Sequence, residues 1–381
     1  MDLQECRKEI DRIDAELVRL LNERMDVSRE VANYKISVGM PVYDPVREKQ
    51  KLDGLKEKAP NEMYAASLRG IFEQIMGNSR KLQYTMMPGA GFVRDFTPVP
   101  RIPVGAGRKI VFFGLVGSYT EQAMQEFFGD MSLMGYESES VGSFREIMQR
   151  VQDGDADYGI LPIENTSTGG IDDIYDLLVE YNNIIVGQHI LKIDQALVGL
   201  PGAKVEELTK VYSHEQGIRQ CASFLREHPQ IEAEVFGSTS GAAKHVADEQ
   251  NPKHAAIAGI RAAQVYGLTV LAPAINQEDS NSTRFIAISS KRMYEKDANL
   301  ISLCLTLPHE EGSLYKILSH IMFNNLNMTK IESRPLPGRP FEYRFFIDFE
   351  GNLAEASVLN ALRGIEAEAQ EMRVLGNYKD V

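Results

Sequence analysis

The sequence predicts a multidomain protein in which an all-α segment, an α/β segment and a ferredoxin-like α+β segment follow one another. A single long helical pattern opens the chain. From Arg108 on, short apolar runs alternate with helical stretches, which is typical of an α/β fold. The last part has the order strand, helix, strand, strand, helix, strand. The length of 381 residues is sufficient for two or three domains.

Three helices are predicted in the first segment, residues 1–86. Residues 3–37 form one helical pattern that ends before Gly39. Asp44 and Pro45 suit the cap and first turn of a second helix, and a third helix continues to about residue 84. So long a first helix buries little apolar surface as a monomer, so we expect it to be shared in a dimer. The sequence leaves open whether dimers associate further into a tetramer.

Cations lie within the apolar seam of the long helix. At about 100° per residue, its apolar residues from Ile13 to Val31 occupy an arc roughly 120° wide. Arg24 and Lys35 lie inside that arc, and Arg7 lies at its edge. Nearby carboxylates could pair with one such cation, because a buried cation without a partner is costly. Three cations facing one core favour a ligand with more than one negative group.

The other two helices add polar side chains to this site. Asp44, Arg47 and Glu48 cluster at the start of the second helix. Ser79 and Gln83 share one face of the third helix because they are four residues apart. The segment contains no histidine and no set of metal ligands. Such a site can orient a dianion and stabilise developing charge, but it lacks the groups for covalent chemistry.

Residues 87–107 contain four prolines and several glycines, so we expect a linker there. The α/β segment, residues 108–290, is predicted to have mainly parallel sheets. Its expected strands are 109–113, 158–163, 184–190, 210–213, 255–258, 268–271 and 285–288. Helices are expected to start near Thr120, Ser143, Asp172, Glu215, Ser240 and Arg261.

Polar residues gather where these strands end, at positions where ligands bind in open α/β sheets. They are Ser118, Tyr119, Glu164, Asn165, Thr166, Ser167, Ser213, His214, Ser238, Thr239, Ser240, Thr283 and Arg284. Serine and threonine at such junctions also cap helices, and we favour that role for Ser240. His214 follows a strand end and is a candidate for a binding role, whereas His189 lies within a strand and is predicted to be a packed core residue.

Charge and cysteine content restrict the class of protein. The net charge of −13 argues against nucleic-acid partners and against anionic membrane surfaces. Cys6, Cys221 and Cys304 form neither a metal pattern nor a disulfide framework, which fits a reducing cytosol. The chain starts without a signal-peptide pattern and has no apolar run that could span a bilayer. We therefore expect a cytoplasmic protein.

The polar set in residues 3–84 resembles the all-helical chorismate mutase family. The resemblance implies that Arg24, Arg47 and the partner subunit's Arg7 hold the two carboxylates of chorismate. It also implies that Lys35 and Gln83 hydrogen-bond the ether oxygen whose bond breaks. Asp44, Glu48 and Ser79 would assist near the hydroxyl and one carboxylate.

Residues 108–290 resemble prephenate dehydratases, through the sequences Pro-Ile-Glu-Asn-Thr at 162–166 and Asp-Ser-Asn-Ser-Thr-Arg-Phe at 279–285. The resemblance implies two lobes around a cleft, as in periplasmic binding proteins, with 108–190 plus 269–290 in one lobe and 191–268 in the other. It implies that Thr283 delivers a proton or hydrogen bond to the departing hydroxyl, and that Arg284 helps to hold the carboxylates. The remaining polar residues at the strand ends would bind prephenate. Leu115 departs from the family, in which we expect proline in the first glycine loop.

Residues 299–377 resemble the ACT domain, a ferredoxin-like module that binds amino acids. The matching sequences are Gly-Ser-Leu-Tyr at 312–315 and Glu-Ser-Arg-Pro at 332–335. The resemblance implies a phenylalanine site at Gly312, Ser313, Leu314, Glu332, Ser333 and Arg334. Gly312 would allow the backbone to approach the ligand closely. The alternative is that Gly312 only caps a helix and that the second sequence is a solvated strand.

Taken in order, the three segments resemble the bifunctional chorismate mutase–prephenate dehydratase family of phenylalanine biosynthesis. The resemblance implies conversion of chorismate to prephenate and of prephenate to phenylpyruvate, without a metal or organic cofactor. It implies inhibition by phenylalanine and a homodimer formed through the helical and ACT domains. Two alternatives remain, namely an arogenate dehydratase and a non-catalytic, two-lobed ligand-binding protein.

Overall fold

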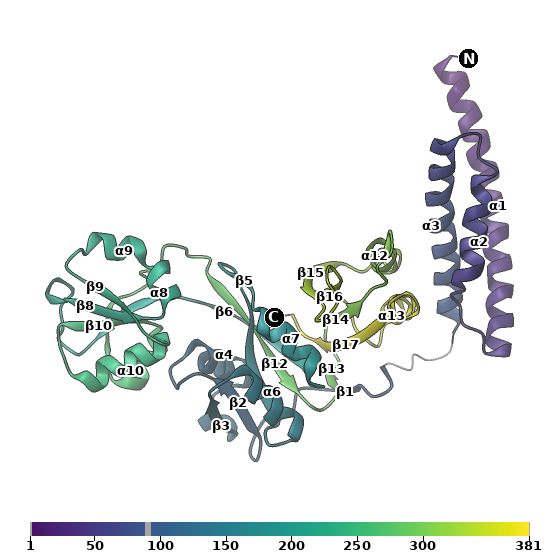
Figure 1. Cartoon of the computed structure of the whole chain (residues 1–381). Helices are drawn as coiled ribbons and strands as arrows, with labels where there is room; N and C mark the ends of the chain where they lie inside the picture. The colour runs from purple at the N-terminus through teal and green to yellow at the C-terminus, as the bar shows by residue number, and fades with distance from the viewer. Residues whose placement is uncertain (1, 88–92, 381) are drawn as a thin grey trace. The chain divides into compact units, whose positions relative to one another are not determined.

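The computed structural model describes residues 2–87 and 93–380, and these form two compact units. The first unit comprises the residues up to 95 together with residues 303–373, and the second comprises residues 96–302 together with those from 374 on. Figure 1 labels the helices and strands along the chain. The boundary between the units passes through the strands β14 (Leu300–Thr306) and β17 (Glu371–Tyr378).

The first unit begins with three helices, as the sequence predicts. They are α1 (Leu3–Val38), α2 (Pro45–Lys56) and α3 (Glu62–Met86). Asp2 and Glu5 form a reciprocal capping box at the start of α1, and Gly39 ends it in the left-handed conformation with φ 69°. Asp44 caps α2 by accepting a hydrogen bond of 3.0 Å from the backbone N–H of Arg47.

The apolar seam of α1 stays exposed in the single chain. Among the described residues of α1, only Ser28 and Ala32 are buried. Apolar side chains elsewhere along the seam are solvent-accessible, with exposed fractions of 55% at Ile10, 51% at Leu17 and 62% at Val27. So continuous an exposed apolar strip is uncommon on a monomeric protein and marks an interaction surface.

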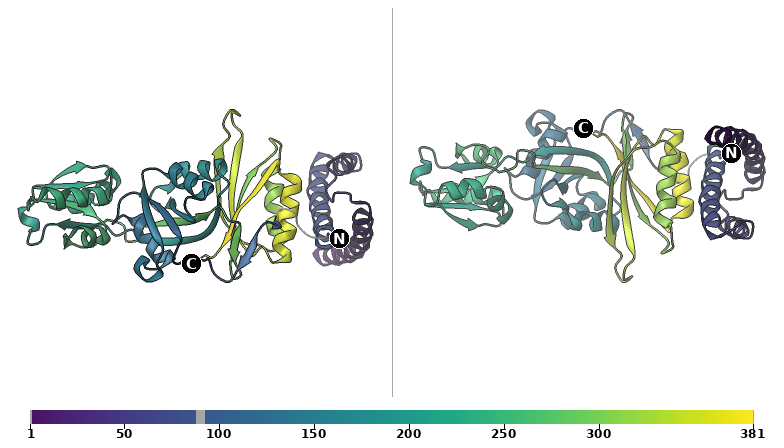
Figure 2. Two further views of the ribbon diagram at one scale, coloured as in Figure 1. Left: turned by 90° about the horizontal axis from the view of Figure 1, so that it is seen from below. Right: turned by 90° about the horizontal axis from the view of Figure 1, so that it is seen from above.

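The C-terminal part of the first unit has the predicted strand and helix order. It consists of β14, α12 (Ser313–Phe323), β15 (Met328–Pro335), β16 (Tyr343–Glu350), α13 (Ala356–Glu368) and β17. The strands are ordered β15-β16-β14-β17, and α12 and α13 lie side by side on one face of them (Figure 2).

Within this unit, α3 packs against α12 and α13. A Cβ atom added at Gly77 would lie 3.1 Å from the ring of Phe323, so glycine permits this close approach. The Lys81 ammonium donates to the backbone oxygen of Phe323, and Arg363 Nη1 donates to the backbone oxygen of Tyr84 over 2.6 Å. These bonds join the helical segment to the C-terminal segment.

The second unit has two lobes, each built on one sheet. In the first lobe the strand order is β6-β12-β4-β2-β3, and the short β5 pairs with β4. The bounds are β2 (Lys109–Phe113), β3 (Glu137–Val141), β4 (Tyr158–Asn165), β5 (Gly169–Gly170), β6 (Ile184–Lys192) and β12 (Ser282–Ser289). The helices of this lobe are α4 (Tyr119–Phe128), α5 (Met131–Met134), α6 (Phe144–Asp153) and α7 (Asp172–Glu180).

The second lobe has the strand order β11-β7-β10-β8-β9. Its strands are β7 (Ala196–Gly199), β8 (Lys210–Ser213), β9 (Glu232–Val235), β10 (His254–Ala258) and β11 (Thr269–Ala272). Its helices are α8 (Glu215–Gln220), α9 (Ala222–Glu227), α10 (Thr239–Glu249) and α11 (Ile260–Tyr266). A core of alanines, valines and leucines fills the space between this sheet and its helices.

Three expectations about this unit are wrong. The sheets are mixed rather than mainly parallel, because β12 is antiparallel to both β4 and β6. The chain leaves the first lobe along β6 and returns along β12, so the two neighbouring strands must run in opposite directions. β11 belongs to the second lobe, where it pairs with β7, and not to the first. The expected linker contains β1 (Thr97–Val99), which pairs with β13 (Met293–Glu295); its residues 88–92 lie outside the described part.

No helix within residues 2–87 and 93–380 is both long enough and apolar enough to cross a membrane.

Candidate active sites

A cavity of about 430 Å³ lies among the three N-terminal helices. Seven of the eight residues predicted for this site line it: Arg24, Lys35, Asp44, Arg47, Glu48, Ser79 and Gln83. Arg7, the eighth, is exposed near the start of α1 and does not line the cavity within one chain.

Two of the cations keep their charge available for a ligand. Arg24 Nη1 donates to the hydroxyl of Ser79 and, over 3.3 Å, to the backbone oxygen of Ile75. Lys35 Nζ donates to the backbone oxygen of Val42 over 2.6 Å. Among the described residues neither cation forms an ion pair, although Glu48 lies near enough to both, and Asp44 to Lys35, to raise their pKa values in part. Burial lowers the pKa of both Arg24 and Lys35, and a bound anion would relieve that cost.

Glu48 is held by a residue that the sequence did not single out. Both oxygens of Glu48 accept hydrogen bonds from Arg80 Nη1, with 2.6 Å to Oε1. The Arg80 guanidinium also lies over the ring of Tyr43, 5.3 Å from its centre. Arg80 directly follows Ser79 on α3, and Gln83 lies three residues later. This position between two predicted site residues is only a weak sequence signal that Arg80 lies at the edge of the site.

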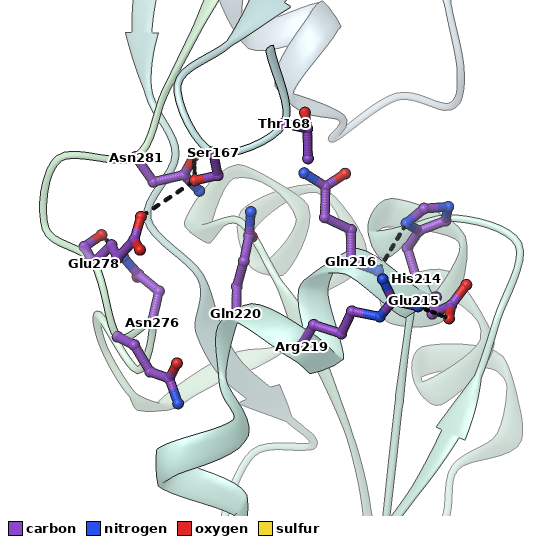
Figure 3. Close-up of a pocket in the computed structure, with 11 residues that line it drawn as sticks. Ser167, Thr168, His214, Glu215, Gln216, Arg219, Gln220, Asn276, Glu278 and Asn281 are labelled. Carbon is purple, nitrogen blue, oxygen red and sulfur yellow. Dashed lines mark hydrogen bonds and ion pairs between the residues drawn. The ribbon is translucent and has the colours of Figure 1, made fainter.

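The second candidate site is a cleft of about 590 Å³ lined by both lobes of the second unit. Eight predicted residues line it: Ser118, Tyr119, Asn165, His214, Ser238, Thr239, Ser240 and Thr283. It adjoins a pocket of about 370 Å³ that Ser167 lines (Figure 3). Thr168, His214, Gln216 and Gln220 line both spaces, so the two are parts of one cleft.

Thr283 is oriented by an amide network at the floor of the cleft. Asn165 Nδ2 contacts Thr283 Oγ1 at 2.9 Å and Asn281 Oδ1 at 3.0 Å. Asn281 Oδ1 also accepts from the Ser167 hydroxyl over 3.3 Å. A threonine hydroxyl has one hydrogen, and here its oxygen is the acceptor. The Thr283 hydrogen has no acceptor among the described residues, so it is free to be donated into the cleft.

Four predicted residues do not line either space. Arg284 lies beside Glu164 on the neighbouring strand, with Nη2 to Oε2 at 3.6 Å. Successive side chains on a strand point to opposite faces, so Thr283 and Arg284 cannot both face the cleft. The Ser213 hydroxyl donates to the backbone oxygen of Ile257 over 2.7 Å, which fixes the end of β8. Thr166 Oγ1 accepts from the backbone N–H of Ser282 over 3.0 Å, which joins the ends of β4 and β12.

Comparison with known proteins gives the same division of the chain. Residues 6–84 match the family Chorismate mutase type II, and residues 110–293 match the family Prephenate dehydratase. A "Bifunctional chorismate mutase/prephenate dehydratase" of Aquifex aeolicus is 30% identical over 380 residues, which cover 99% of this chain and 98% of that protein.

The chain belongs to the bifunctional chorismate mutase/prephenate dehydratase family. It is therefore an enzyme of phenylalanine biosynthesis with a mutase region and a dehydratase region, and the non-catalytic alternative is set aside.

Two further relatives cover less of the chain. An "Arogenate dehydratase/prephenate dehydratase 6, chloroplastic" of Arabidopsis thaliana is 34% identical and covers 74% of this chain and 71% of its own length. A prephenate dehydratase structure from Arthrobacter aurescens, in complex with L-Phe, has a TM-score of 0.65 and 28% identity. It covers 71% of this chain and 90% of its own.

Helix caps account for part of the polar set in the dehydratase cleft. Ser118 caps α4, His214 caps α8 and Ser238 caps α10. The prediction that Ser240 is a cap is wrong, because the cap lies two residues earlier and Ser240 is buried in the first turn of α10. These caps leave backbone N–H groups at three helix starts near the cleft, where anions bind favourably.

The first glycine loop of the dehydratase region closes with Leu115 at the position where we expected proline. The backbone N–H of Ser118 donates to the Leu115 oxygen over 3.1 Å, and the leucine side chain is 40% exposed. The loop is also tied to the second lobe through Glu121, which accepts from the backbone N–H of Gly117 over 3.0 Å and from Arg261 over 2.8 Å. The loop's shape is thus set by the backbone and by Glu121.

Tyr119 contacts the segment of the chain that connects the two lobes. Its hydroxyl donates to the backbone oxygen of Asp194 over 2.8 Å. Burial raises the pKa of Tyr119, so the phenol stays neutral and remains a donor. A Cβ atom at Gly259 would lie 3.0 Å from the Tyr119 ring, which explains why a residue without a side chain is needed there.

Several cleft residues were missed from the sequence. Gln216 and Gln220 are four residues apart on α8 and both face the cleft, a spacing that could have been recognised. Asn281 and Phe285 belong to the predicted motif at 279–285 but were not among the predicted site residues, and they follow the same alternation as Thr283. His189 is 19% exposed, contacts Glu126 at 2.8 Å and lines neither space.

The residues predicted for an effector lie on α12 and β15. Gly312 precedes α12 with φ 77°, a conformation that favours glycine. Glu332 and Arg334 share one face of β15, and Ser333 lies on the other. Across the described ranges there is no group of three or more His, Cys, Asp or Glu residues that could hold a metal ion.

Proposed function

We propose that the helical cavity rearranges chorismate to prephenate and that the cleft converts prephenate to phenylpyruvate. The observation that carries the proposal for the dehydratase is the orientation of Thr283 by Asn165. The observation that carries it for the mutase is a cavity with Arg24 and Lys35 unpaired by carboxylates.

In the mutase cavity, Arg24 and Arg47 would each hold a carboxylate of chorismate. The rearrangement breaks one C–O bond and forms one C–C bond within a single molecule, so it needs no external acid or nucleophile. Lys35 and Gln83 would donate hydrogen bonds to the ether oxygen as negative charge develops on it. Such bonds, aimed at charge that appears only in the transition state, raise the rate directly.

The mutase site is completed by a second chain in this proposal. Arg7 lies outside the cavity of its own chain, and the apolar seam of α1 is exposed. A dimer along α1 would cover that seam and bring the partner's Arg7 to the cavity. Whether dimers pair into tetramers through the C-terminal segments is a separate question, which sedimentation of the full chain answers.

In the dehydratase cleft, Thr283 would donate its hydrogen to the departing hydroxyl of prephenate. The ring carboxylate leaves as CO2, its bonding electrons enter the ring, and the hydroxyl leaves as water with the proton from Thr283. A proton from solvent then restores the threonine hydroxyl. Because the ring becomes aromatic, a weak acid held in the correct place is sufficient. Helix starts capped by Ser118, His214 and Ser238 would hold the carboxylates. Arg284 does not line the cleft, so in this proposal it does not contact them.

An arogenate dehydratase activity of the same cleft is the second candidate, since a relative bears both names. Arogenate carries an ammonium where prephenate carries a keto oxygen. Steady-state kinetics on both substrates decide between them, and we expect the larger kcat/KM for prephenate.

Phenylalanine would act as a feedback inhibitor by binding the C-terminal segment, which we assign to the ACT family. The support is the L-Phe complex of the Arthrobacter aurescens dehydratase. Gly312, Ser313 and Leu314 would approach the amino acid from α12, and Glu332, Ser333 and Arg334 from β15. Cys6, Cys221 and Cys304 are all free thiols, which supports a reducing, cytoplasmic setting.

The two activities are tested separately with purified full chain. Chorismate consumption reports the mutase and phenylpyruvate absorbance reports the dehydratase. Absence of either activity in the folded wild-type chain would refute the corresponding half of the proposal.

A further inference from the structure

A buried chain of ionic contacts leads from the mutase cavity into the C-terminal segment, entirely within the first unit. Arg80 Nη1 holds Glu48 at the cavity, and Arg80 Nη2 lies 3.0 Å from Glu368 Oε1 on α13. His320 on α12 contacts the same Glu368 oxygen at 2.9 Å. The Arg80, Glu368 and His320 side chains are only 9%, 4% and 7% exposed.

We infer that Arg80 is a positioning residue for the mutase and that Glu368, from the C-terminal segment, sets its position. This inference rests on the proposed mutase function. Arg80 acts through Glu48, which is the group that faces chorismate. Glu368 holds the second nitrogen of the same rigid guanidinium, so the direction of Nη1 toward Glu48 is fixed from outside the helical segment.

Stability alone gives a weak reason for this arrangement. Burying an arginine between two carboxylates costs desolvation that the ion pairs repay only in part. In addition, Arg80 Nε and Glu368 Oε2 are buried without a hydrogen-bond partner among the described residues. A contact optimised only for packing would not leave two such atoms unsatisfied.

The surrounding contacts explain why the position of Glu368 is well defined. The backbone oxygen of Tyr84 accepts from Arg363, and the hydroxyl of Thr85 accepts from Asn360 over 3.2 Å, so α13 is fixed along the same stretch of α3. The hydrogen bond from His320 and the charge of Arg80 outweigh burial and keep the pKa of Glu368 below its usual value. Glu368 is therefore a carboxylate at neutral pH and a lasting partner for Arg80.

A matched pair of variants separates this role from general damage to the contact between α3 and α13. Glu368→Ala removes the partner of Arg80, whereas Arg363→Ala removes a neighbouring bond from α13 to α3 that does not reach Glu48. In the full chain, we expect Glu368→Ala to lower mutase kcat/KM at least about tenfold, as expected for loss of one charged hydrogen bond. Arg363→Ala should stay within about twofold, and dehydratase kcat/KM should stay within about twofold in both variants.

A double-mutant cycle supplies a second readout. If Glu368 acts through Arg80, the variant carrying both Arg80→Met and Glu368→Ala should be no worse than Arg80→Met alone. If the two substitutions act independently, their fold-losses in mutase kcat/KM multiply in the double variant, and that result would overturn the inference. Equal losses of mutase kcat/KM in Glu368→Ala and Arg363→Ala would overturn it as well. If Arg80→Met fails to fold, the comparison of Glu368→Ala with Arg363→Ala decides alone.

Failure of the inference and failure of the mutase proposal can be told apart with Arg24→Ala. Loss of mutase activity in Arg24→Ala with a normal Glu368→Ala variant rejects only the role of Arg80 and Glu368. Unchanged mutase activity in Arg24→Ala rejects the site itself.

Discussion

Replacing Thr283 with valine removes one hydroxyl from the dehydratase cleft and keeps the shape of the side chain. Thr283 Oγ1 lies 2.9 Å from Asn165 Nδ2, and the residue is 8% exposed. Loss of a positioned general acid typically lowers kcat by about 100-fold to 10,000-fold, or roughly 2.7–5.4 kcal/mol in the activation free energy.

The same substitution should change stability much less. Asn165 Nδ2 also contacts Asn281 Oδ1 at 3.0 Å and the backbone oxygen of Ser282 at 3.1 Å. Its two hydrogens thus keep two acceptors in the variant, so no buried donor is left unpaired. We expect the free energy of unfolding to fall by no more than about 1 kcal/mol. A fall in kcat of about 100-fold or more therefore cannot be explained by so small a loss of folding stability.

The assay is the initial rate of phenylpyruvate formation at saturating prephenate. Thr283→Ser is the matched control, since it keeps a hydroxyl at the same position, and it should retain most of the activity. A Thr283→Val enzyme within a few-fold of the wild type would show that another group delivers the proton and would refute the reasoning from the Asn165 contact.

Three further outcomes follow from the structure. Burial lowers the pKa of Lys35 from 10.5, and only the protonated amine can donate to the ether oxygen, so mutase kcat/KM should fall as pH rises through that lowered value. In Lys35→Arg this fall at alkaline pH should disappear, because the guanidinium stays charged. A fall that persists in the variant would assign it to another group. Leu17→Glu places a charge in the exposed seam of α1, where the side chain is 51% accessible, so sedimentation should show a smaller species with weakened mutase activity; an unchanged assembly would place the dimer contact elsewhere. Glu332→Ala should raise the phenylalanine concentration that inhibits the dehydratase without lowering its kcat, and an unchanged inhibition curve would remove Glu332 from the effector site.

The helices were the most predictable part of the fold. The first helix is expected over residues 3–37 and is observed as Leu3–Val38, because both of its ends carry caps that can be read from local sequence. The four-residue strand β7 gives only a short apolar signal, and it was missed. The lobe to which β11 belongs depends on which strand it pairs with, and that is decided by tertiary contacts.

In the candidate sites, too, residues whose role depends on tertiary contacts could not be predicted from local sequence. Arg24 and Lys35 were recognised because a cation in an apolar seam violates the helical pattern. Arg80 was missed because its partner Glu368 lies 288 residues later in the chain, and no local pattern links the two. The motif containing Thr283 and Arg284 identified the right segment, but strand alternation places only Thr283 on the cleft.

The claim that two separate active sites share this chain is tested most directly by assaying one Arg24→Ala preparation on both substrates. We expect chorismate conversion to fall at least about 100-fold, because a fixed charge that holds the substrate and steadies the transition state is removed. Prephenate conversion should stay within about twofold of the wild type, since Arg24 lies in the first unit and the cleft in the second. Loss of both activities in a folded variant, or mutase activity close to that of the wild type, would contradict the account.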